Sequence, residues 1–410
     1  MRKTLLATVV LSALAVPAMA DNSVTIYGQA NAALEWASNG SKDTGTAGKV
    51  SQWKIDGGGN LETPSRLGFK GNADLGGGLN AFFQYETTLF GDNGADGNND
   101  GLKTFNNGTH LGDREAWVGL QSADVGKIEL GHGKTPYVNL ADVEDSLVIG
   151  ANNLAIYNTG ITNVAGGANG NQYQMGSYVT YGATMATNTF TAVSGKIDSN
   201  GVITKRPPNG IRYDSPDFDG FKFATYLGLG ENKTATTSET TDFSLGANYT
   251  NGPFFVGAAY QSDNNLPNAG NNNAKSQAFL LTGTFKLDDW MIGVGGQSSK
   301  QTVPLATTTD YKQLAFQLFS TYAIGPTVLK AGLVDFGNVK ISGHSQSNTG
   351  DLRYMVGANY YFTKAVFGFV EFAGDSNRGK MLAADPAAAK GTVIDAPSPT
   401  ALSIGMSYSF

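Results

Sequence analysis

The residues best placed to do chemistry in this sequence are basic side chains on a predicted strand. Arg66 and Lys70 alternate with Leu67 and Phe69, so in an extended strand the basic pair shares one face and the apolar pair the other. An arginine keeps its charge at any ordinary pH and acts on nearby ions through its field rather than by forming bonds. The pattern therefore predicts that these residues act on dissolved ions and small solutes through their electric field.

Acidic residues that can oppose these charges gather in the segment "ADVEDS", where Asp142, Glu144 and Asp145 put three acids within four residues. Basic and acidic groups that face each other across a narrow aqueous opening create a transverse field, which sorts small solutes by charge and dipole. A solvated loop tip is the plainer interpretation of the same cluster, and the sequence leaves both open.

Two other kinds of site are weaker candidates. Asp96, Asn98 and Asp100 in "DGNNDG" have the spacing of a calcium loop, but Asn107 stands where the bidentate glutamate belongs, so a solvated loop is the default. The three histidines, His110, His132 and His344, belong to no motif that joins them to a serine and a carboxylate, which argues against an enzyme. No cofactor is expected.

The elements that must position these residues are strands with alternating faces. In "DFSLGANYT" (242–250), for example, every second residue is apolar. Seven short turns separate pairs of strands: "DLGGG" (74–78), "SADVGK" (122–127), "SPDFDG" (215–220), "NGP" (251–253), "LDD" (287–289), "IGP" (324–326) and "FTK" (362–364). These turns join fourteen strands in pairs, and long polar segments separate the pairs. The first and last strands bring the predicted total to sixteen.

An even number of antiparallel strands with short turns on one side and long loops on the other is typical of a transmembrane β-barrel. Sixteen strands enclose a lumen too wide to fill with side chains, so the apolar faces must point outward into lipid. The final strand "ALSIGMSYSF" (401–410) then closes against the first (23–36), with Tyr408 and Phe410 as aromatics at the membrane interface.

The start of the chain and its overall charge indicate its destination and exclude one class of partner. Residues 1–20 combine Arg2 and Lys3, an apolar stretch and "AMA", which predicts a cleaved secretory signal and a mature barrel from 21 to 410. After the signal, no apolar run approaches the roughly 20 residues of a membrane helix. Without Arg2 and Lys3 the charge of the mature chain is −8 (26 basic and 34 acidic residues), which argues against a nucleic-acid partner.

Several segments resemble the general porins of Gram-negative, especially β-proteobacterial, outer membranes: "SVTIYGQ" (23–29), "SRLGFKGNADLGGGLNAFFQYE" (65–86), "REAWVGL" (114–120), "IRYDSPDFDGF" (211–221) and the final "MSYSF". This resemblance implies a homotrimeric diffusion channel in contact with outer-membrane lipid and lipopolysaccharide. Ions and small hydrophilic solutes would pass through it, and a third loop folded into the lumen, placed here at 134–209, would narrow it. The segment 171–193 alternates like a strand and can form a hairpin within that loop.

The resemblance also implies which residues form the basic side of the constriction. Arg66 matches the family's "SRxGxxG" pattern, and Arg114 matches its basic residue before "AWVGL". Parity puts Arg114 on the lipid face, so a β-bulge is expected to turn it inward. Arg212 matches the basic residue of the family's "VRY" segment and sits low in the wall, so Arg206 is the alternative.

One departure from the family concerns "LGHGKTP" (130–136), where the family commonly has Gly-Arg. If His132 takes the place of that arginine, the positive wall is weaker and its charge depends on pH. Otherwise His132 lies at a loop hinge and Lys134 supplies the charge. A porin specific for sugars or carboxylates is the main alternative function. It would need an aromatic ladder or dedicated binding groups in the lumen, and the three scattered aromatics Tyr27, Phe82 and Tyr361 do not make a ladder.

Overall fold

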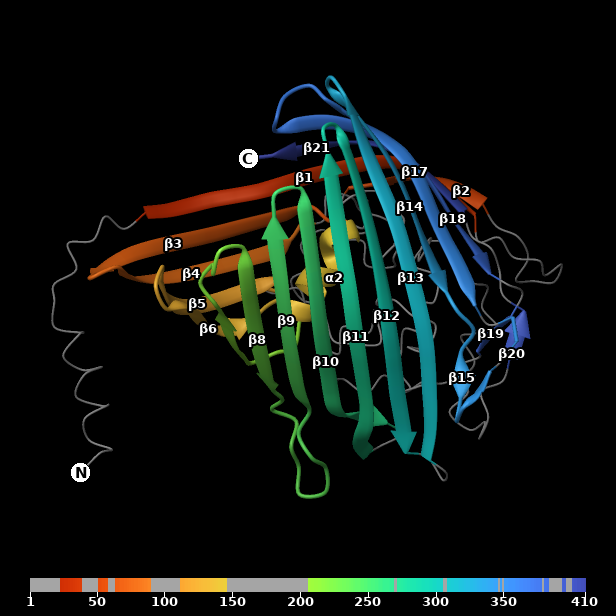
Figure 1. Cartoon of the computed structure of the whole chain (residues 1–410), viewed down its shortest axis with the longest axis horizontal. Coiled ribbons are helices and arrows are strands. Elements are labelled where there is room, and N and C mark those ends of the chain that lie inside the picture. Colours follow the sequence, from red (N-terminus) through yellow and green to blue (C-terminus); the bar gives the residue numbers. More distant parts are fainter. Residues whose placement is uncertain are drawn as a thin grey trace.

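The fold is a closed β-barrel with a helix inside it. The computed structural model describes residues 23–38, 51–57, 63–89, 111–145, 206–268, 271–304, 308–345, 347–348, 350–377, 380–382, 393–395 and 400–410. Within these residues, sixteen antiparallel strands pair in order around a ring, and β1 closes it by pairing with both β3 and β21 (Figure 1). The predicted fold class is confirmed.

The barrel strands have the following bounds: β1 (Ser23–Ser38), β3 (Arg66–Gly76), β4 (Leu79–Thr88), β5 (Glu115–Ser122), β6 (Gly126–His132), β7 (Gly210–Asp214), β8 (Phe221–Leu229), β9 (Thr241–Asn251), β10 (Phe254–Asn268), β11 (Asn271–Leu287), β12 (Trp290–Pro304), β13 (Thr308–Ile324), β14 (Thr327–Phe336), β17 (Asp351–Tyr361), β18 (Val366–Asn377) and β21 (Thr400–Ser409). All seven predicted short turns join neighbouring strands at one end of the barrel. In the two-residue turn of "NGP", Gly252 has a φ of 55°, which a residue without Cβ adopts readily.

In the part of the chain that the structure describes, five short strands lie outside this ring and were not expected from the sequence: β2 (Ser51–Asp56), β15 (Lys340–Ile341), β16 (His344–Ser345), β19 (Lys380–Leu382) and β20 (Val393–Asp395). β2 pairs with the second half of β1, from Ala33 to Ser38, whereas β3 pairs with the first half, from Ser23 to Gln29. The first strand is therefore long enough to pair with two strands, β2 and β3, along the same edge.

The structure shows the alternation predicted from the sequence: polar side chains of each strand face the lumen and apolar ones face outward. On β13, Leu314, Phe316 and Leu318 point outward, and the Phe316 side chain is 61% exposed. Gln313, which precedes Leu314, and Gln317, which lies between Phe316 and Leu318, point inward and are buried. Because large apolar side chains cover the outer face of strand after strand, this face suits hydrocarbon rather than water.

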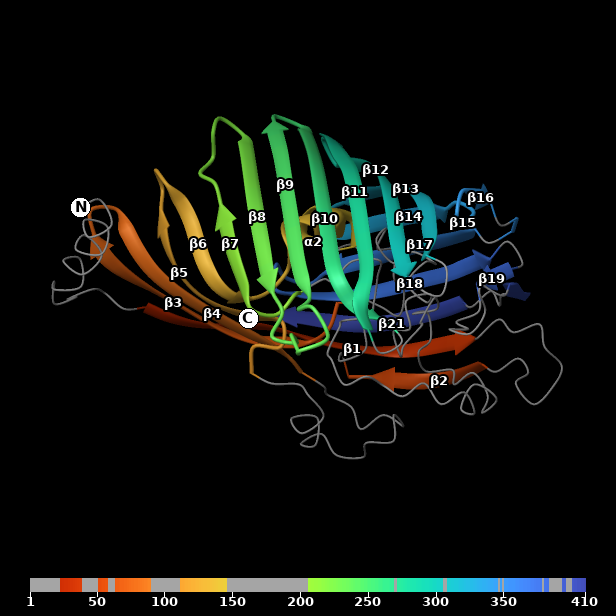
Figure 2. The same ribbon diagram turned by 90° about the horizontal axis from the view of Figure 1, so that it is seen from below.

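A helix lies inside the barrel, where the sequence predicted only a loop. α2 (Pro136–Asp145) follows β6 and packs on the inner faces of β9 and β10, and the figures show it within the ring of strands (Figure 1, Figure 2). No helix in the part of the chain that the structure describes is long and apolar enough to cross a membrane. The predicted hairpin at 171–193 and the signal at 1–20 lie outside the described residues.

Closure of the barrel depends on the last residue of the chain. The Gly28 backbone N–H donates to the Phe410 carbonyl at 3.0 Å, and the Phe410 N–H donates back to the Gly28 carbonyl at 3.1 Å. The Phe410 ring lies over Gly28, where a Cβ would come within 2.5 Å of it. Tyr408 and Phe410 rings are 6.0 Å apart and both are exposed on the outer face, as the sequence predicts for interfacial aromatics.

Candidate functional site

Three of the predicted basic residues come together in the lumen around two glutamates. We call Arg66, Arg114 and Arg206, with Glu86 and Glu115, the arginine cluster. Arg114 Nε lies 2.7 Å from Glu86 Oε1, Arg66 Nε lies 4.0 Å from Glu86 Oε2, and Arg206 Nε lies 3.6 Å from Glu115 Oε1. Arg114 lies close enough to both other arginines for their charges to act on it. Three guanidinium groups thus share two carboxylates.

The path of the backbone, rather than a β-bulge, turns Arg114 inward. The β4–β5 register runs without a shift from Glu86 opposite Glu115 to Leu79 opposite Ser122. Arg114 precedes β5, and its backbone N–H donates to the Glu86 carbonyl at 3.1 Å. Because the residue is outside the strand, strand parity does not determine its direction.

Lys70 faces the lumen, as predicted, but contacts an aromatic ring. Its ammonium lies 5.3 Å from the centre of the Tyr27 ring, a cation–π contact. Gln84 donates to the Tyr27 hydroxyl at 2.8 Å, and the ring fits there because Gly68 has no Cβ. Tyr27 is therefore engaged by three neighbours on β3 and β4.

The two predicted sides of the constriction meet each other at Lys134 and Asp142. These residues were expected to face one another across the lumen, but the Lys134 ammonium contacts Asp142 Oδ2 directly. Asp142 lies on α2 rather than at a solvated loop tip. Glu144 and Asp145 form the last turn of the same helix, and their side chains lie outside the described residues.

Arg212 belongs to a second group of charges, nearer the short turns. It lies between Asp214, whose Oδ1 is 2.7 Å from its Nη2, and Glu129, whose Oε1 is 3.3 Å from its Nε. Lys127 joins the same two acids at 2.8 Å and 3.2 Å. Arg212 also donates to the Lys134 carbonyl at 2.7 Å, so this network supports the start of α2.

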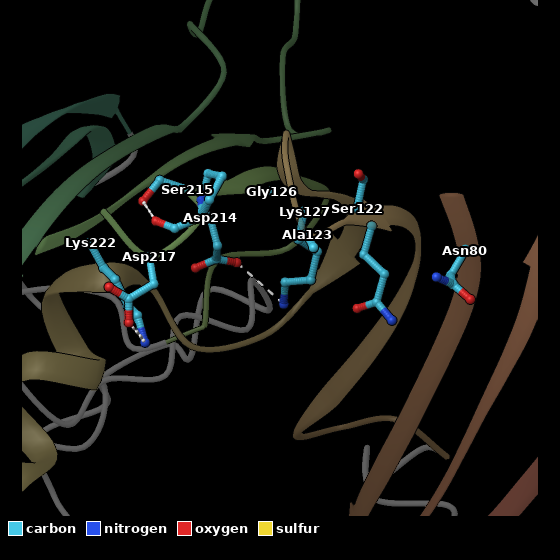
Figure 3. A pocket seen from close by; sticks show the side chains of 11 residues that line it. Asn80, Ser122, Ala123, Gly126, Lys127, Asp214, Ser215, Asp217 and Lys222 are labelled. Atoms are coloured by element: carbon cyan, nitrogen blue, oxygen red, sulfur yellow. Dashed lines mark hydrogen bonds and ion pairs between the residues drawn. The ribbon is translucent and has the colours of Figure 1, made fainter. Parts of the chain in front are cut away.

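A polar cavity of about 440 Å³ opens beside this network at the short-turn end of the lumen (Figure 3). Two ion pairs line it, Lys127 with Asp214 at 3.2 Å and Lys222 with Asp217 at 3.1 Å. The backbone N–H of Gly220 and the Lys222 ammonium lower the pKa of Asp217, which lies in the turn outside the strands. The cavity contains both charge signs in equal number.

His132 is held at a hinge between two loop ends. Its Nδ1 lies 3.2 Å from the Pro207 carbonyl and its Nε2 lies 3.1 Å from the Asp113 carbonyl. Both partners can only accept, so the neutral ring donates to one of them and the protonated ring to both. This placement favours the hinge interpretation over a direct place in the basic wall.

Side-chain and backbone hydrogen bonds attach α2 to the inner wall. Thr135 caps the helix, since its hydroxyl accepts from the Val138 N–H at 3.3 Å, and it donates to Gln261 at 2.6 Å. The Tyr137 hydroxyl donates to Gln297 at 2.6 Å, and the Tyr137 N–H donates to Ser244 at 3.0 Å. Two glycines of the wall, Gly246 and Gly257, leave the space that Leu140 occupies.

Gly246→Val is expected to displace α2 from the wall and change the conductance. A Cβ at 246 would lie 3.1 Å from Leu140 and 3.2 Å from the Pro136 carbonyl, and the backbone of Pro136 cannot rotate away. Single-channel conductance would measure the effect. Gly296→Val is the matched control, because a Cβ there meets nothing closer than Phe316 at 3.5 Å. Equal conductance changes in the two variants would contradict the packing of α2 against Gly246.

Most of the acids that complete the site were not among the residues predicted from the sequence. Glu86, Glu115, Glu129 and Asp214 all bind a predicted basic residue. Parity within β4, β5, β6 and β7 places them on the lumen face, so alternation was the signal available. The calcium candidates Asp96, Asn98 and Asp100 lie outside the described residues, within which no group of three His, Asp or Glu side chains can hold a metal ion.

The lumen aromatics do not form a ladder within the described strands. Tyr27 lies under Lys70, Phe82 lies 5.5 Å from the Lys127 ammonium, and Tyr361 packs on Phe367 at 4.9 Å. They belong to β1, β4 and β17, no two of which are neighbours in the barrel.

Comparisons with known proteins agree with this architecture. The chain is 26% identical to an outer membrane porin protein of Bordetella pertussis over 324 residues, 75% of this chain and 68% of the relative. It is 27% identical to the major outer membrane protein P.IB of Neisseria meningitidis serogroup B over 395 residues, 93% of this chain and 95% of the relative.

Solved structures share the fold at low sequence identity. An anion-selective porin from Comamonas acidovorans superposes with a TM-score of 0.68 at 20% identity, over 95% of this chain and all of that one. OmpT of Vibrio cholerae in a trimer form gives 0.60 at 16% identity, over 95% and 99%.

A family model described as "Gram-negative porin" matches residues 7–380, which is most of the chain. The chain therefore belongs to the Gram-negative porin family: it is a channel of the outer membrane through which small solutes diffuse, and not an enzyme.

Proposed function

We propose that the arginine cluster, with α2 beside it in the lumen, forms the charged constriction of this channel and that the channel prefers anions. The observation that carries the proposal is the excess of one positive charge where Arg66, Arg114 and Arg206 surround Glu86 and Glu115. Lys70 adds a further positive charge on the same strand face as Arg66.

The charge that matters for selectivity is local. The whole chain has a formal net charge of −6, which would favour cations if every charge counted equally. Charges farther from the ion path than about 10 Å are largely screened at 0.1 M salt, so groups that line the narrow part dominate. The ion pair of Lys134 with Asp142 contributes no net charge beside the cluster. The anion-selective porin of Comamonas acidovorans, which has a similar fold, supports the same direction.

The reversal potential in a tenfold gradient of potassium chloride across a planar bilayer tests this proposal. We expect the sign that corresponds to chloride preference, increasing as total salt is lowered because screening then weakens. A potassium preference at low salt would overturn it, since the acidic groups would then dominate the constriction.

Four further features are proposed, each on its own observation. The apolar outer face and its interfacial aromatics fit outer-membrane lipid and lipopolysaccharide, and the trimer form of the similar OmpT supports a homotrimer. The pattern of residues 1–20 supports a signal that is cleaved before Asp21, leaving 21–410 as the barrel domain. The segment between β6 and β7, from 134 to 209, is proposed as the constriction loop, because α2 begins it inside the lumen.

A further inference from the structure

The carbonyl of Pro207 is held from both sides at the point where the chain enters β7. The Tyr226 hydroxyl on β8 donates to it at 2.5 Å, and His132 Nδ1 at the end of β6 lies 3.2 Å away. β6 and β8 are the two neighbours of β7 in the barrel. One backbone oxygen therefore connects three consecutive strands.

The side chain of Tyr226 is fixed by its surroundings. It is only 1% exposed and its ring meets Trp117 edge to face, with centroids 6.1 Å apart. A Cβ on Gly210 would lie 2.1 Å from the Tyr226 hydroxyl, and one on Gly228 would lie 3.0 Å from Pro207. Because the two glycines make this close approach possible, the hydroxyl has little freedom to point elsewhere.

His132 connects the backbone next to two arginines of the cluster. Its Nε2 lies 3.1 Å from the carbonyl of Asp113, which precedes Arg114, and its Nδ1 contacts Pro207, which follows Arg206. One imidazole thus spans the two loop ends that carry these arginines.

The Nε atom of Arg206 is not held by a hydrogen bond within the cluster. Its Nε is 3.6 Å from Glu115 Oε1, too long for a hydrogen bond, and this buried nitrogen has no other hydrogen-bond partner among the described residues. The side chain is 10% exposed, so it lies within the wall of the cluster. Its position therefore depends on the backbone beside it, at Pro207.

We propose that Tyr226 and His132 are positioning residues that fix the Pro207 carbonyl, hold Arg206 in the arginine cluster and so set the charge selectivity of the channel. The proposal rests on the function proposed above, in which that cluster is the constriction. Tyr226 presents no charge to passing ions and acts only through the place it gives to Arg206.

Tyr226→Phe tests the proposal, because it removes the hydroxyl and keeps the ring against Trp117. In a potassium chloride gradient at low salt, we expect the chloride-to-potassium permeability ratio to fall about twofold as Arg206 moves away from the ion path. Arg206→Gln should lower it further, and the double variant should match Arg206→Gln alone. Tyr213→Phe is the matched control, since its hydroxyl also donates to a backbone carbonyl, that of Val125 at 2.8 Å, at the short-turn end.

The heat stability of each variant in detergent separates positioning from folding, and His132→Gln provides a second variant if Tyr226→Phe does not assemble. A reduced ratio that disappears in the Arg206→Gln background supports the proposal. An unchanged ratio in folded Tyr226→Phe and His132→Gln, or the same reduction in both backgrounds, overturns it. If Arg206→Gln and Arg66→Gln both leave the ratio unchanged, the cluster is not the constriction and the function proposed above fails as well.

Discussion

Gly28→Val is expected to prevent the barrel from closing, so that little protein reaches the outer membrane in folded form. A Cβ at residue 28 would lie 2.5 Å from the Phe410 ring and 2.6 Å from the Arg66 carbonyl, so the substitution disturbs both neighbours of β1 at once. Overpacking usually costs about 1–3 kcal/mol where side chains can move. The cost is higher here because the Arg66 carbonyl is backbone, and because an open strand edge in lipid leaves polar groups unpaired.

The measurement is the amount of heat-modifiable barrel in purified outer membranes. Ala32→Val is the matched control, since Ala32 is exposed on the same outer face of β1, opposite Met406. Phe410→Ala should also lower assembly, but less than Gly28→Val, because its backbone bonds to Gly28 can still form. Normal levels of folded Gly28→Val protein would show that the junction of β1 with β3 and β21 tolerates a side chain at this position.

The barrel was predictable because a membrane imposes a simple rule on each strand. Successive side chains of a strand point alternately to lipid and to lumen, so each strand shows an apolar–polar alternation. Turns such as "NGP" mark where each strand ends. β2 has a similar alternation in "SQWKID", but its pairing with the second half of β1 depends on a distant partner. No local pattern distinguishes such a strand from a loop.

α2 had a local signal that the strand patterns obscured. Thr135 followed by Pro136 is a common start of a helix, with the threonine as N-cap and the proline in the first turn. The hydrogen bond from Val138 N–H to the Thr135 hydroxyl confirms the cap. The acids of "ADVEDS" therefore belong to a helix, and Asp142 can reach back to Lys134.

The partners of the charged residues were less predictable than their faces. Parity placed Arg66 and Lys70 in the lumen correctly, but it does not say that Glu86 lies across from Gly68, between them. That requires the register of β3 with β4. Arg114 shows a second limit, because it precedes its strand and its direction comes from a backbone hydrogen bond to Glu86.

Arg66→Gln is expected to give the largest loss of anion preference among single substitutions that leave the barrel intact. Arg66 is the most exposed arginine of the cluster, at 31%, and lies 4.0 Å from Glu86, which Arg114 binds more closely at 2.7 Å. Removing Arg66 therefore leaves Glu86 paired. Arg114→Gln would leave this buried carboxylate without its close partner and would destabilise the protein as well.

The size of the effect follows from the charge that is lost. A unit charge about 4 Å from a passing ion contributes about 1 kcal/mol even at the dielectric constant of water, which is roughly fivefold in the permeability of that ion. Because the charge attracts chloride and repels potassium, its loss can change the chloride-to-potassium permeability ratio by up to about 30-fold. The interaction should fall to roughly a quarter of this value in 1 M salt, where the screening length is about 3 Å, so the ratio should change far less. Reversal potentials at low and high salt measure both effects. Lys222→Gln removes the same charge from the short-turn end, where Lys222 is paired with Asp217, and should shift the ratio much less. An equal shift in the two variants would mean that selectivity comes from the charge of the whole lumen, because only a narrow site at Arg66 can make one position count more than another.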